Sequence, residues 1–436
     1  MYKLGHNFFI PSKEVFWDYR KEQNPHLMII GKSGSGKTYL LRNILSHFAL
    51  KEKGKINVFV IDFHGDLEIG DSQTIEFNKN DVNSAGIGIF EFDYFSKAGG
   101  IYNRVDELVK IFENSFFPQM SPLRKALLKK LLLDVYIKKG YDPDDKSTWN
   151  KPLSNLPTID DLAALISSIL DILEEMKSKK ESINYSVAIE QFKSLMSKKN
   201  DFNEKELVKK AEEIFNLYKK ELLEEDKSIE EKLGIKDFSF YTKKNVLSSL
   251  ESMEVYINAM KESKIFSKHN TILDKNKNVF RFNLKYLEDE MMLFIANLII
   301  QRIFTKLRMR YKYKQGEKTN INTFIVIDES KLILPNREKN NDLHFINRIV
   351  SEARKFGLGI ILASQRISHY SQEMISNIAT KIVLNTDESE QPLVKKKLGI
   401  EQAEKVFKQI QSKQYGIAYV KRTKEAEVVK LISFER

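Results

Sequence analysis

The chain has 436 residues, of which 42% are hydrophobic and 30% charged, enough for more than one domain and too apolar for a wholly disordered chain. It contains no cysteine, which excludes disulfides and thiolate metal sites and fits a reducing compartment. Lysine and arginine outnumber aspartate and glutamate by 71 to 60, which gives a net charge of +11. This balance suits a polyanionic partner, although a lysine-rich solvated surface would give the same number.

The sequence shows no membrane-spanning segment. Its longest apolar run, Met291–Ile300, is about half the ~20 residues that a span requires. The start of the chain also lacks the apolar core of a signal peptide. We therefore expect a soluble, cytoplasmic protein without direct membrane insertion.

The first expected elements are short strands followed by a glycine-rich loop. Residues 3–18 alternate apolar and polar side chains, which predicts one or two strands. An apolar run ending at Ile30 predicts a buried strand, and a helical pattern begins at Tyr39. Between them the chain reads Gly-x-x-x-x-Gly-Lys-Thr, formed by Gly31, Lys32, Ser33, Gly34, Ser35, Gly36, Lys37 and Thr38.

This loop has the spacing and the flanking elements of a P-loop. Its glycines let successive N–H groups face a phosphate, and the helix N-terminus adds the positive end of its dipole. Lys37 can reach the β- and γ-phosphates, and the Thr38 hydroxyl can ligate Mg²⁺. The sequence therefore predicts a site for a nucleoside triphosphate, taken as ATP, together with Mg²⁺.

After the P-loop the chain changes from alternating strands and helices to helices alone. Apolar runs at residues 56–61 and 87–92 predict two further strands. Helical periodicity then dominates from about Tyr102 to about Ser267, and Thr158 is the expected N-cap of one helix. Residues 174–232 are rich in Lys and Glu, which predicts long surface helices or a mobile helical arm, with disorder as the alternative.

Alternating strands and helices return in the last part of the chain. A long helix is expected from Glu288 to about Tyr313, and strands are expected at 278–282, 323–328, 359–364, 381–384 and 417–420. This pattern predicts an α/β fold with a mainly parallel sheet that is interrupted by an all-α insertion domain. We expect the first part of the core in residues 1–100, the insertion in 101–268 and the second part of the core in 269–436.

The strand that begins at Thr323 ends in two carboxylates, Asp328 and Glu329. Asp328 can hold Mg²⁺ through water and complement Thr38, and Glu329 can polarise the attacking water as a general base. An adjacent Asp-Glu pair downstream of a P-loop is typical of the branch that includes RecA-like and AAA+ motors. We therefore expect a RecA-like P-loop NTPase core.

Two more polar residues flank the next strand. In that branch this strand lies between the P-loop strand and the Asp-Glu strand, so Gln365 at its tip is predicted to sense the γ-phosphate; the alternative is a plain strand end. Arg354 precedes the strand and either completes a helix C-terminus or reaches a neighbouring subunit's nucleotide as an arginine finger. The predicted catalytic residues are thus Lys37, Glu329, Gln365 and Arg354.

Four other segments each allow two interpretations. Asp62–Asp66 is expected to form a turn, and direct catalysis by His64 is the alternative. Lys306–Lys314 interleaves basic and aromatic residues, which suits either a phosphate backbone or a solvated helix end. Lys395–Lys397, and Arg337 with Lys339, are similar candidates for nucleic-acid contacts.

Taken in order, these motifs resemble the HerA/FtsK superfamily of P-loop motors. The segment Pro25-His26-Leu27, which leads into the strand before the P-loop, is typical of that group. The segment Asp62-Phe63-His64-Gly65-Asp66 is similar to the HerA segment Asp-Pro-His-Gly-Glu. Asp328-Glu329-Ser330 matches the family's Asp-Glu-Ala or Asp-Glu-Ser. Arg354-Lys355-Phe356-Gly357 and Ala363-Ser364-Gln365-Arg366 resemble Arg-Lys-Tyr-Gly and Ala-Thr-Gln-Arg. The matches cover residues 4–92 and 279–420.

The resemblance implies a homo-oligomer, expected to be a hexameric ring, with ATP bound between subunits and duplex DNA threaded through a basic pore. It supports Arg354 as the finger and Gln365 as the sensor. Archaeal-type HerA proteins carry a β-barrel before the P-loop that commonly mediates partnering with a nuclease, whereas only 30 residues precede Gly31 here. Partnership with a nuclease or another effector is therefore left open. The start of the chain also lacks a membrane anchor, which argues against FtsK proper and most conjugative coupling proteins.

Three functions remain open from the sequence. The leading hypothesis is an ATP-driven DNA translocase or helicase-like motor in DNA processing, mobile-element handling or defence. The second is a type IV secretion or conjugation ATPase acting on protein subunits, because the helical insertion resembles that of those relatives. The third is an ATP-dependent switch that regulates a partner nuclease without translocating.

Overall fold

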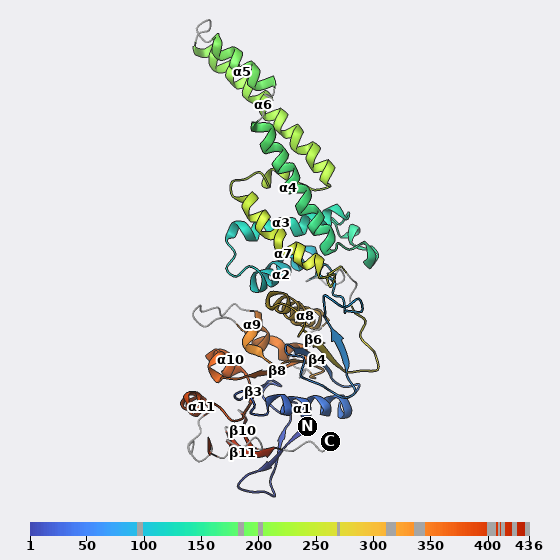
Figure 1. The fold of residues 1–436 in the computed structure, drawn as a ribbon, viewed down its shortest axis with the longest axis vertical. Coiled ribbons are helices and arrows are strands. Elements are labelled where there is room, and N and C mark those ends of the chain that lie inside the picture. The colour runs from blue at the N-terminus through green and yellow to red at the C-terminus, as the bar shows by residue number, and fades with distance from the viewer. Residues whose placement is uncertain are drawn as a thin grey trace. The chain divides into compact units, whose positions relative to one another are not determined.

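The computed structural model describes residues 1–93, 99–181, 187–198, 204–267, 271–310, 320–334, 345–398, 407–408, 410, 415–420 and 425–431. The chain divides into two compact units (Figure 1). The sheet unit comprises Met1–Gly86 and Asn270–Arg436, and the helical unit comprises Ile87–His269. The sheet unit is first interrupted after Gly86, earlier than the boundary at residue 100 that the sequence predicts. Residues 87–93 therefore belong to the helical unit.

The sheet unit is built on one eleven-stranded sheet with the order β2-β1-β11-β10-β9-β3-β8-β7-β4-β6-β5. Its strands are β1 (Tyr2–Asn7), β2 (Glu14–Trp17), β3 (Leu27–Ile30), β4 (Asn57–Asp62), β5 (Gln73–Glu76), β6 (Val279–Asn283), β7 (Thr323–Ile327), β8 (Leu358–Ser364), β9 (Thr380–Val383), β10 (Tyr415–Val420) and β11 (Glu425–Leu431). The strands from β9 to β5 in this order are parallel. The other four pair antiparallel. The predicted mainly parallel α/β sheet is confirmed.

The apolar strands are buried on both sides. Every residue of β3, β7 and β8 is buried. The described helices of this unit are α1 (Lys37–Lys51), α8 (Asp289–Arg310), α9 (Phe345–Glu352), α10 (Gln372–Asn377) and α11 (Gln391–Leu398). Figure 1 shows α1 and α8 on opposite faces of the parallel strands. Covered parallel strands read as continuous apolar runs, which is why the sequence revealed them.

The strand order positions the candidate site. β8 pairs with β3 on one side and with β7 on the other, as the sequence predicted. Because all three strands are parallel, the P-loop after β3, the Asp-Glu pair after β7 and Gln365 after β8 meet at the same edge of the sheet. The Asp62 turn after β4 joins them, since β4 pairs with β7.

Three predictions about strands were wrong or incomplete. Residues 87–92 form no strand, because the carbonyl oxygens of Ile89 and Phe90 accept hydrogen bonds from the Arg104 guanidinium and the Tyr136 hydroxyl instead of a neighbouring strand. The structure also contains β5 and β11, which the sequence analysis did not predict.

The elements that the structure describes in the helical unit are helices. They are α2 (Ile101–Ser115), α3 (Pro122–Lys138), α4 (Ile159–Glu181), α5 (Val187–Ser197), α6 (Glu204–Leu233) and α7 (Val246–Glu262), with short 3-10 turns between them. The Thr158 hydroxyl accepts the Asp161 N–H at 3.3 Å, and the Asp161 carboxylate accepts the Thr158 N–H at 2.9 Å. This reciprocal cap confirms the predicted helix start. Apart from Lys198, which lies in a turn, the described parts of residues 174–232 are helical.

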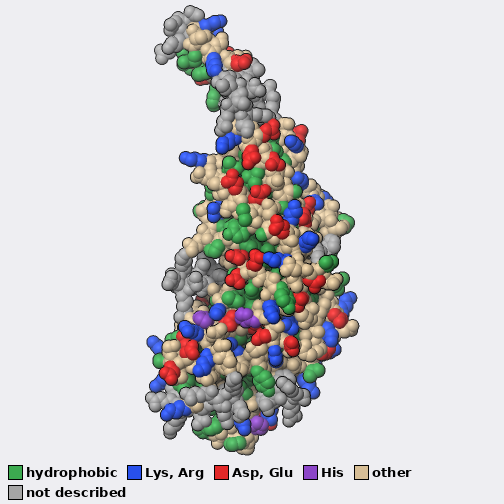
Figure 2. Space-filling model, in the orientation of Figure 1, with side chains coloured by type: hydrophobic (Ala, Val, Ile, Leu, Met, Phe, Trp, Pro, Cys, Tyr) green, Lys and Arg blue, Asp and Glu red, His purple; other side chains and the backbone are tan. Residues whose placement is uncertain are grey.

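The surface carries mixed charge. On the face shown in Figure 2, Lys and Arg side chains are interspersed with Asp and Glu rather than gathered in one patch. Among the described helices, none has both the length and the hydropathy that crossing a membrane requires.

Candidate nucleotide site

The glycine-rich loop joins β3 to α1 in a conformation that requires glycine. Gly34 and Gly36 have φ values of 72° and 99°, in the left-handed region that favours glycine. A Cβ on Gly31 would lie 2.3 Å from the Ser35 Oγ, so that position has no room for a side chain. The Lys37 Nζ donates to the carbonyl oxygens of Gly31 at 2.6 Å and Lys32 at 3.2 Å, which holds the ammonium over the loop.

The loop opens into a cavity of about 780 Å³ that also receives the tips of β4, β7 and β8. Its lining residues are Ser33, Gly34, Gly36, Lys37, Thr38, Tyr39, Leu41, Arg42, His64, Asp66, Asp328, Glu329, Gln365 and Leu431. The structure therefore brings Lys37, Thr38, Asp328, Glu329 and Gln365 together around one cavity. The predicted loop residues Ser33, Gly34 and Gly36 line it too, so the predicted site residues that do not are Arg354, Gly31, Lys32 and Ser35.

Three carboxylates cluster beside the loop. One oxygen from each of Asp62, Asp66 and Asp328 lies within 4.8 Å of the others. The Asp66 Oδ2 is also 3.5 Å from the Thr38 Oγ1. Carboxylate and hydroxyl oxygens are the ligands that Mg²⁺ prefers, so the donor set fits that ion.

Asp62 is engaged by the protein. Its Oδ1 accepts the Gly65 N–H at 2.8 Å, and its Oδ2 accepts the Arg281 Nε at 2.7 Å and the Leu67 N–H at 3.1 Å. Arg281 also donates to the Gly65 carbonyl at 2.9 Å. This buried ion pair fixes the turn that presents Asp66, leaving Asp66 and Asp328 as the carboxylates facing the P-loop.

The electrostatics of the cavity favour a bound cation. Burial raises the pKa of Asp328 well above its usual value, and the neighbouring carboxylates of Asp62, Asp66 and Glu329 add to the rise. Burial lowers the pKa of Lys37, whereas the Glu329 carboxylate opposes that shift. A divalent cation next to Asp328 would stabilise its ionised form.

Glu329 and Gln365 lie at the tips of adjacent strands. Glu329 is only 5% exposed, and its Oε2 accepts the Gln365 Nε2 at 3.4 Å. Its Oε1 has no hydrogen-bond partner within the described part of the chain. That oxygen is itself buried, so the carboxylate has hydrogen-bonding capacity that no described group uses.

A buried network that the sequence analysis missed supports these two residues. The Ser330 Oγ donates to the Ala363 carbonyl at 2.9 Å and lies 2.8 Å from the Tyr370 hydroxyl. The Ser364 Oγ lies 2.6 Å from the His369 Nδ1. These contacts join the ends of β7 and β8, so they fix the positions from which Glu329 and Gln365 enter the cavity.

Asp66 is a further site residue that the motifs did not single out. It stands at the position of the Glu in the similar HerA segment, and the sequence predicts only a turn there. The structure contains the turn and also places Asp66 in the cavity, with the exposed side chain of His64 at the wall. The signal in the sequence is that the apolar strand at residues 56–61 ends at Asp62, whereas its pairing with the Asp-Glu strand comes from the structure.

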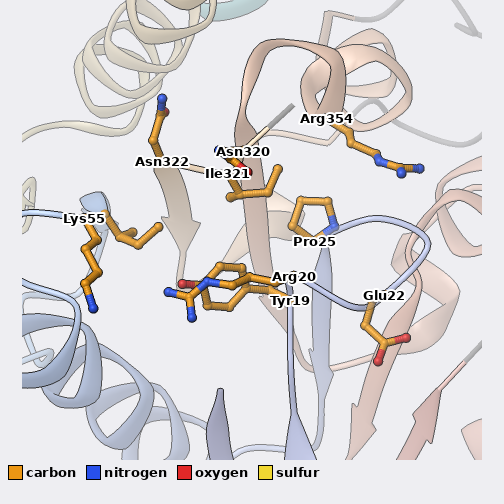
Figure 3. A pocket seen from close by; sticks show the side chains of 10 residues that line it. Tyr19, Arg20, Glu22, Pro25, Lys55, Asn320, Ile321, Asn322 and Arg354 are labelled. Atoms are coloured by element: carbon orange, nitrogen blue, oxygen red, sulfur yellow. The ribbon is translucent and has the colours of Figure 1, made fainter. Parts of the chain in front are cut away.

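Arg354 lies elsewhere. It belongs to the 3-10 turn η6 (Ala353–Phe356) before β8, is exposed, and lines a separate cavity of about 370 Å³ (Figure 3). In Figure 3 its guanidinium points away from the charged ends of Arg20 and Lys55. Gly357 follows with φ 76° and ends the turn, so the helix-terminus interpretation describes the local structure.

The other basic candidates are only partly described. Lys306–Arg310 ends α8, and the Arg308 guanidinium lies 6.0 Å from the centre of the Phe304 ring. Lys395–Lys397 forms the last turn of α11. Tyr311–Lys314, Arg337 and Lys339 lie outside the described residues.

A strand, a glycine loop and a helix that meet an acidic pair on a parallel sheet define a P-loop NTPase. Two family models match the chain: "Helicase HerA, central domain" over residues 13–133, and "Zonular occludens toxin (Zot)" over residues 258–386. Fold and site together make the chain a P-loop ATPase, a class that takes ATP with Mg²⁺, and the matches make it similar to proteins of the HerA/FtsK type.

The relatives are helicases by name. The probable helicase MJECL08 of Methanocaldococcus jannaschii is 22% identical over 366 residues, which cover 82% of this chain and 56% of that protein. The DNA double-strand break repair helicase HerA of Sulfurisphaera tokodaii is 30% identical over 115 residues, covering 26% of this chain and 23% of that protein. The chain thus spans about half the length of the first relative, and its match to the second covers less than a quarter of that protein.

Solved structures share the fold at low identity. VirB4 of Thermoanaerobacter pseudethanolicus aligns with a TM-score of 0.63 and 14% identity over 100% of this chain and 96% of that one. The bacterial conjugative coupling protein TrwBdeltaN70 aligns with a TM-score of 0.54 and 12% identity over 94% of this chain and 85% of that one.

Proposed function

We propose that the chain is the ATP-hydrolysing subunit of a DNA motor, in which copies assemble so that hydrolysis in one copy depends on its neighbour. The observation that carries this proposal is the single cavity shared by Lys37, Thr38, Asp66, Asp328, Glu329 and Gln365. It contains each group that phosphoryl transfer to water needs within one copy: a phosphate cradle, cation ligands and a base.

Each residue has a proposed role in hydrolysis. The P-loop N–H groups and Lys37 bind the phosphates, and Thr38, Asp66 and Asp328 hold Mg²⁺ directly or through water. Bound Mg²⁺ would neutralise charge on the phosphate oxygens. Glu329 takes a proton from the attacking water, and Gln365 orients Glu329 and contacts the γ-phosphate.

Arg354 is proposed to act on the nucleotide of a neighbouring copy. It precedes β8, whereas Gln365 follows it, and the seven residues of this strand separate the two by roughly 20 Å at about 3.3 Å per residue. Arg354 is therefore out of reach of its own cavity. An exposed arginine at the opposite edge is suited to complete another copy's site, which is the support for a ring.

DNA is the proposed substrate because one of the two matching family models and the relatives are named as helicases, and because the net charge is +11. The test is ATPase activity of the full chain with and without long duplex DNA, together with DNA binding over a salt series. We expect stimulation by duplex and binding that weakens steeply with salt. If there is neither DNA binding at low salt nor stimulation by long duplex, the DNA role is wrong.

A secretion ATPase that acts on protein subunits is the second candidate. Its support is the fold likeness to VirB4, which spans the helical unit as well as the sheet unit. That candidate predicts ATPase activity indifferent to DNA. Lys37→Ala should abolish nucleotide binding in either case, so DNA dependence is the discriminating result.

A further inference from the structure

Three buried hydroxyl groups lie directly behind the cavity residues Glu329 and Gln365. Ser330 follows Glu329 after the end of β7, and Ser364, the last residue of β8, precedes Gln365. Tyr370, a few residues further along the chain, hydrogen-bonds to both serines. The side chains of all three are 0% exposed, so the protein itself has to supply their hydrogen-bond partners.

The direction of these hydrogen bonds follows from counting protons, because each hydroxyl has one proton to donate. The Ser330 Oγ donates its proton to the Ala363 carbonyl at 2.9 Å. In the 2.8 Å contact between the Ser330 Oγ and the Tyr370 hydroxyl, the donor is therefore Tyr370. Burial raises the pKa of Tyr370, and its hydrogen bonds to the serines offset only part of the rise, so the hydroxyl keeps its proton.

The same count fixes the remaining two contacts. Since the Tyr370 proton is already donated, Ser364 is the donor in its hydrogen bond to Tyr370. The Ser364 Oγ then offers only lone pairs to the His369 Nδ1, which lies 2.6 Å away, so that nitrogen carries a proton. We call the resulting series the Tyr370 network; in order of donation it consists of His369, Ser364, Tyr370, Ser330 and the Ala363 carbonyl.

His369 is suited to begin this network. Burial lowers the pKa of His369, and the positive charge of Lys331 adds to that shift, so the ring carries a single proton at neutral pH. The preceding residue is held from another segment, because the Ser368 N–H donates to the Glu390 carboxylate at 3.0 Å. Neither His369 nor Tyr370 lines the nucleotide cavity. The network therefore acts on the cavity only through the residues next to its serines.

We propose that Tyr370 is a positioning residue for ATP hydrolysis, and that its network sets the separation of Glu329 and Gln365 by donating from the His369 Nδ1 towards β7. The Tyr370 hydroxyl links the serine beside Glu329 to the serine beside Gln365. A displacement of about 1 Å can cost about 10²-fold in rate, so loss of the link should slow the chemical step. This inference rests on the proposed function and adds residues that do not touch the nucleotide.

The first test is Tyr370→Phe in the full chain, which removes the hydroxyl and keeps the ring. We expect kcat for ATP hydrolysis to fall about 10- to 100-fold and the equilibrium affinity for ATP with Mg²⁺ to change by less than about twofold. The matched control is Tyr136→Phe. Tyr136 is equally buried, and its hydroxyl donates to the Phe90 carbonyl in the helical unit.

The control separates positioning from stability. Each variant loses a buried hydroxyl group that forms hydrogen bonds, so urea unfolding should show a loss of stability in both. Only Tyr370→Phe should lose kcat. A loss of kcat no larger than that of Tyr136→Phe, or an ATP affinity that falls as much as kcat, would overturn the positioning role.

The second test concerns the direction of donation and uses two substitutions of nearly equal size. The amide of His369→Asn can donate to the Ser364 Oγ, whereas the carboxylate of His369→Asp can only accept. We expect kcat of the asparagine variant within about threefold of wild type and kcat of the aspartate variant at least about tenfold lower. Equal kcat values in the two variants would overturn the direction. A wild-type chain that binds ATP and never hydrolyses it would instead contradict the proposed function, and this inference with it.

Discussion

The two edges of the parallel strands carry opposite chemistry. At the carboxyl edge, the P-loop after β3 faces Asp66 and Asp328, and the buried Glu329 has one oxygen without a hydrogen-bond partner among the described residues. At the amino edge, Arg354 lies exposed before β8, and the buried His26 lies before β3. The comparison teaches that one copy contains a nearly complete hydrolytic site and an arginine that cannot reach it. The predictions below test whether the second edge serves the first edge of another copy.

The largest effect is expected at the amino edge. Arg354→Ala should lower ATP hydrolysis by about 10³-fold or more, because it removes the cation that would offset transition-state charge. ATP binding to the isolated chain should change little, since Arg354 does not line its own nucleotide cavity. The matched control is Arg348→Ala, an arginine that is also exposed and lies on α9. Equal losses in the two variants would remove the proposed role.

The corresponding change at the carboxyl edge is Glu329→Gln. We expect hydrolysis to fall by about 10²- to 10⁴-fold, because the amide cannot accept the proton of the attacking water. Nucleotide binding should persist, which a binding titration beside a steady-state assay will show. Glu388→Gln, at an exposed glutamate near α11, is the control. Hydrolysis close to wild type in Glu329→Gln would assign the base elsewhere.

The folding stability of the chain should depend on pH through His26, which lies at the amino edge. Burial lowers the pKa of His26 to about 4, and its Nδ1 accepts the Ile360 N–H at 3.2 Å, joining β3 to β8. In the unfolded chain the pKa of His26 is about 6.5, so the unfolded chain binds the proton first as the pH falls. The folding stability that is present above pH 6.5 is therefore lost progressively between pH 6.5 and pH 4.

The lost stability should amount to about 3 kcal/mol between pH 7 and pH 4. Urea unfolding of the wild type and of His26→Gln at several pH values measures it. The stability advantage of the wild type should shrink by that amount as the pH falls. An advantage that is independent of pH would mean that His26 is not held neutral.

The smallest effect concerns the ion. Asp66→Asn should raise the Mg²⁺ concentration for half-maximal hydrolysis about tenfold, because it removes one carboxylate beside Thr38. Glu68→Gln, an exposed glutamate two residues further on, should leave that concentration unchanged. A Mg²⁺ requirement unaffected by Asp66→Asn would leave Asp328 as the carboxylate that holds the ion.

The same two edges show which parts of the fold and of the site could be predicted from the sequence. Continuous apolar runs predicted the central strands, and motif spacing predicted the residues at their carboxyl ends, because parallel strands bring those ends together. The order of β3, β8 and β7 was predicted from the strand arrangement of the branch of P-loop motors that an adjacent Asp-Glu pair indicates. What the sequence could not provide was the partner of each polar atom.

Asp66 illustrates this limit, because its proximity to Thr38 depends on the buried contact between Asp62 and Arg281, which are far apart in the sequence. β11 was missed because its alternating polar residues lack a continuous apolar run, yet it supplies Leu431 to the cavity. Residues 87–92 show the reverse error, since their apolar run packs within the helical unit without strand pairing.

The most direct test of the central claim is to mix Arg354→Ala subunits with Glu329→Gln subunits and measure ATP hydrolysis across mixing ratios. Each variant alone should be inactive. Mixed assemblies contain interfaces at which an intact Glu329 cavity meets an intact Arg354 from the other variant, so activity should reappear and peak at intermediate ratios. No recovery at any ratio, in assemblies shown to contain both variants, would contradict a site completed by a neighbouring copy.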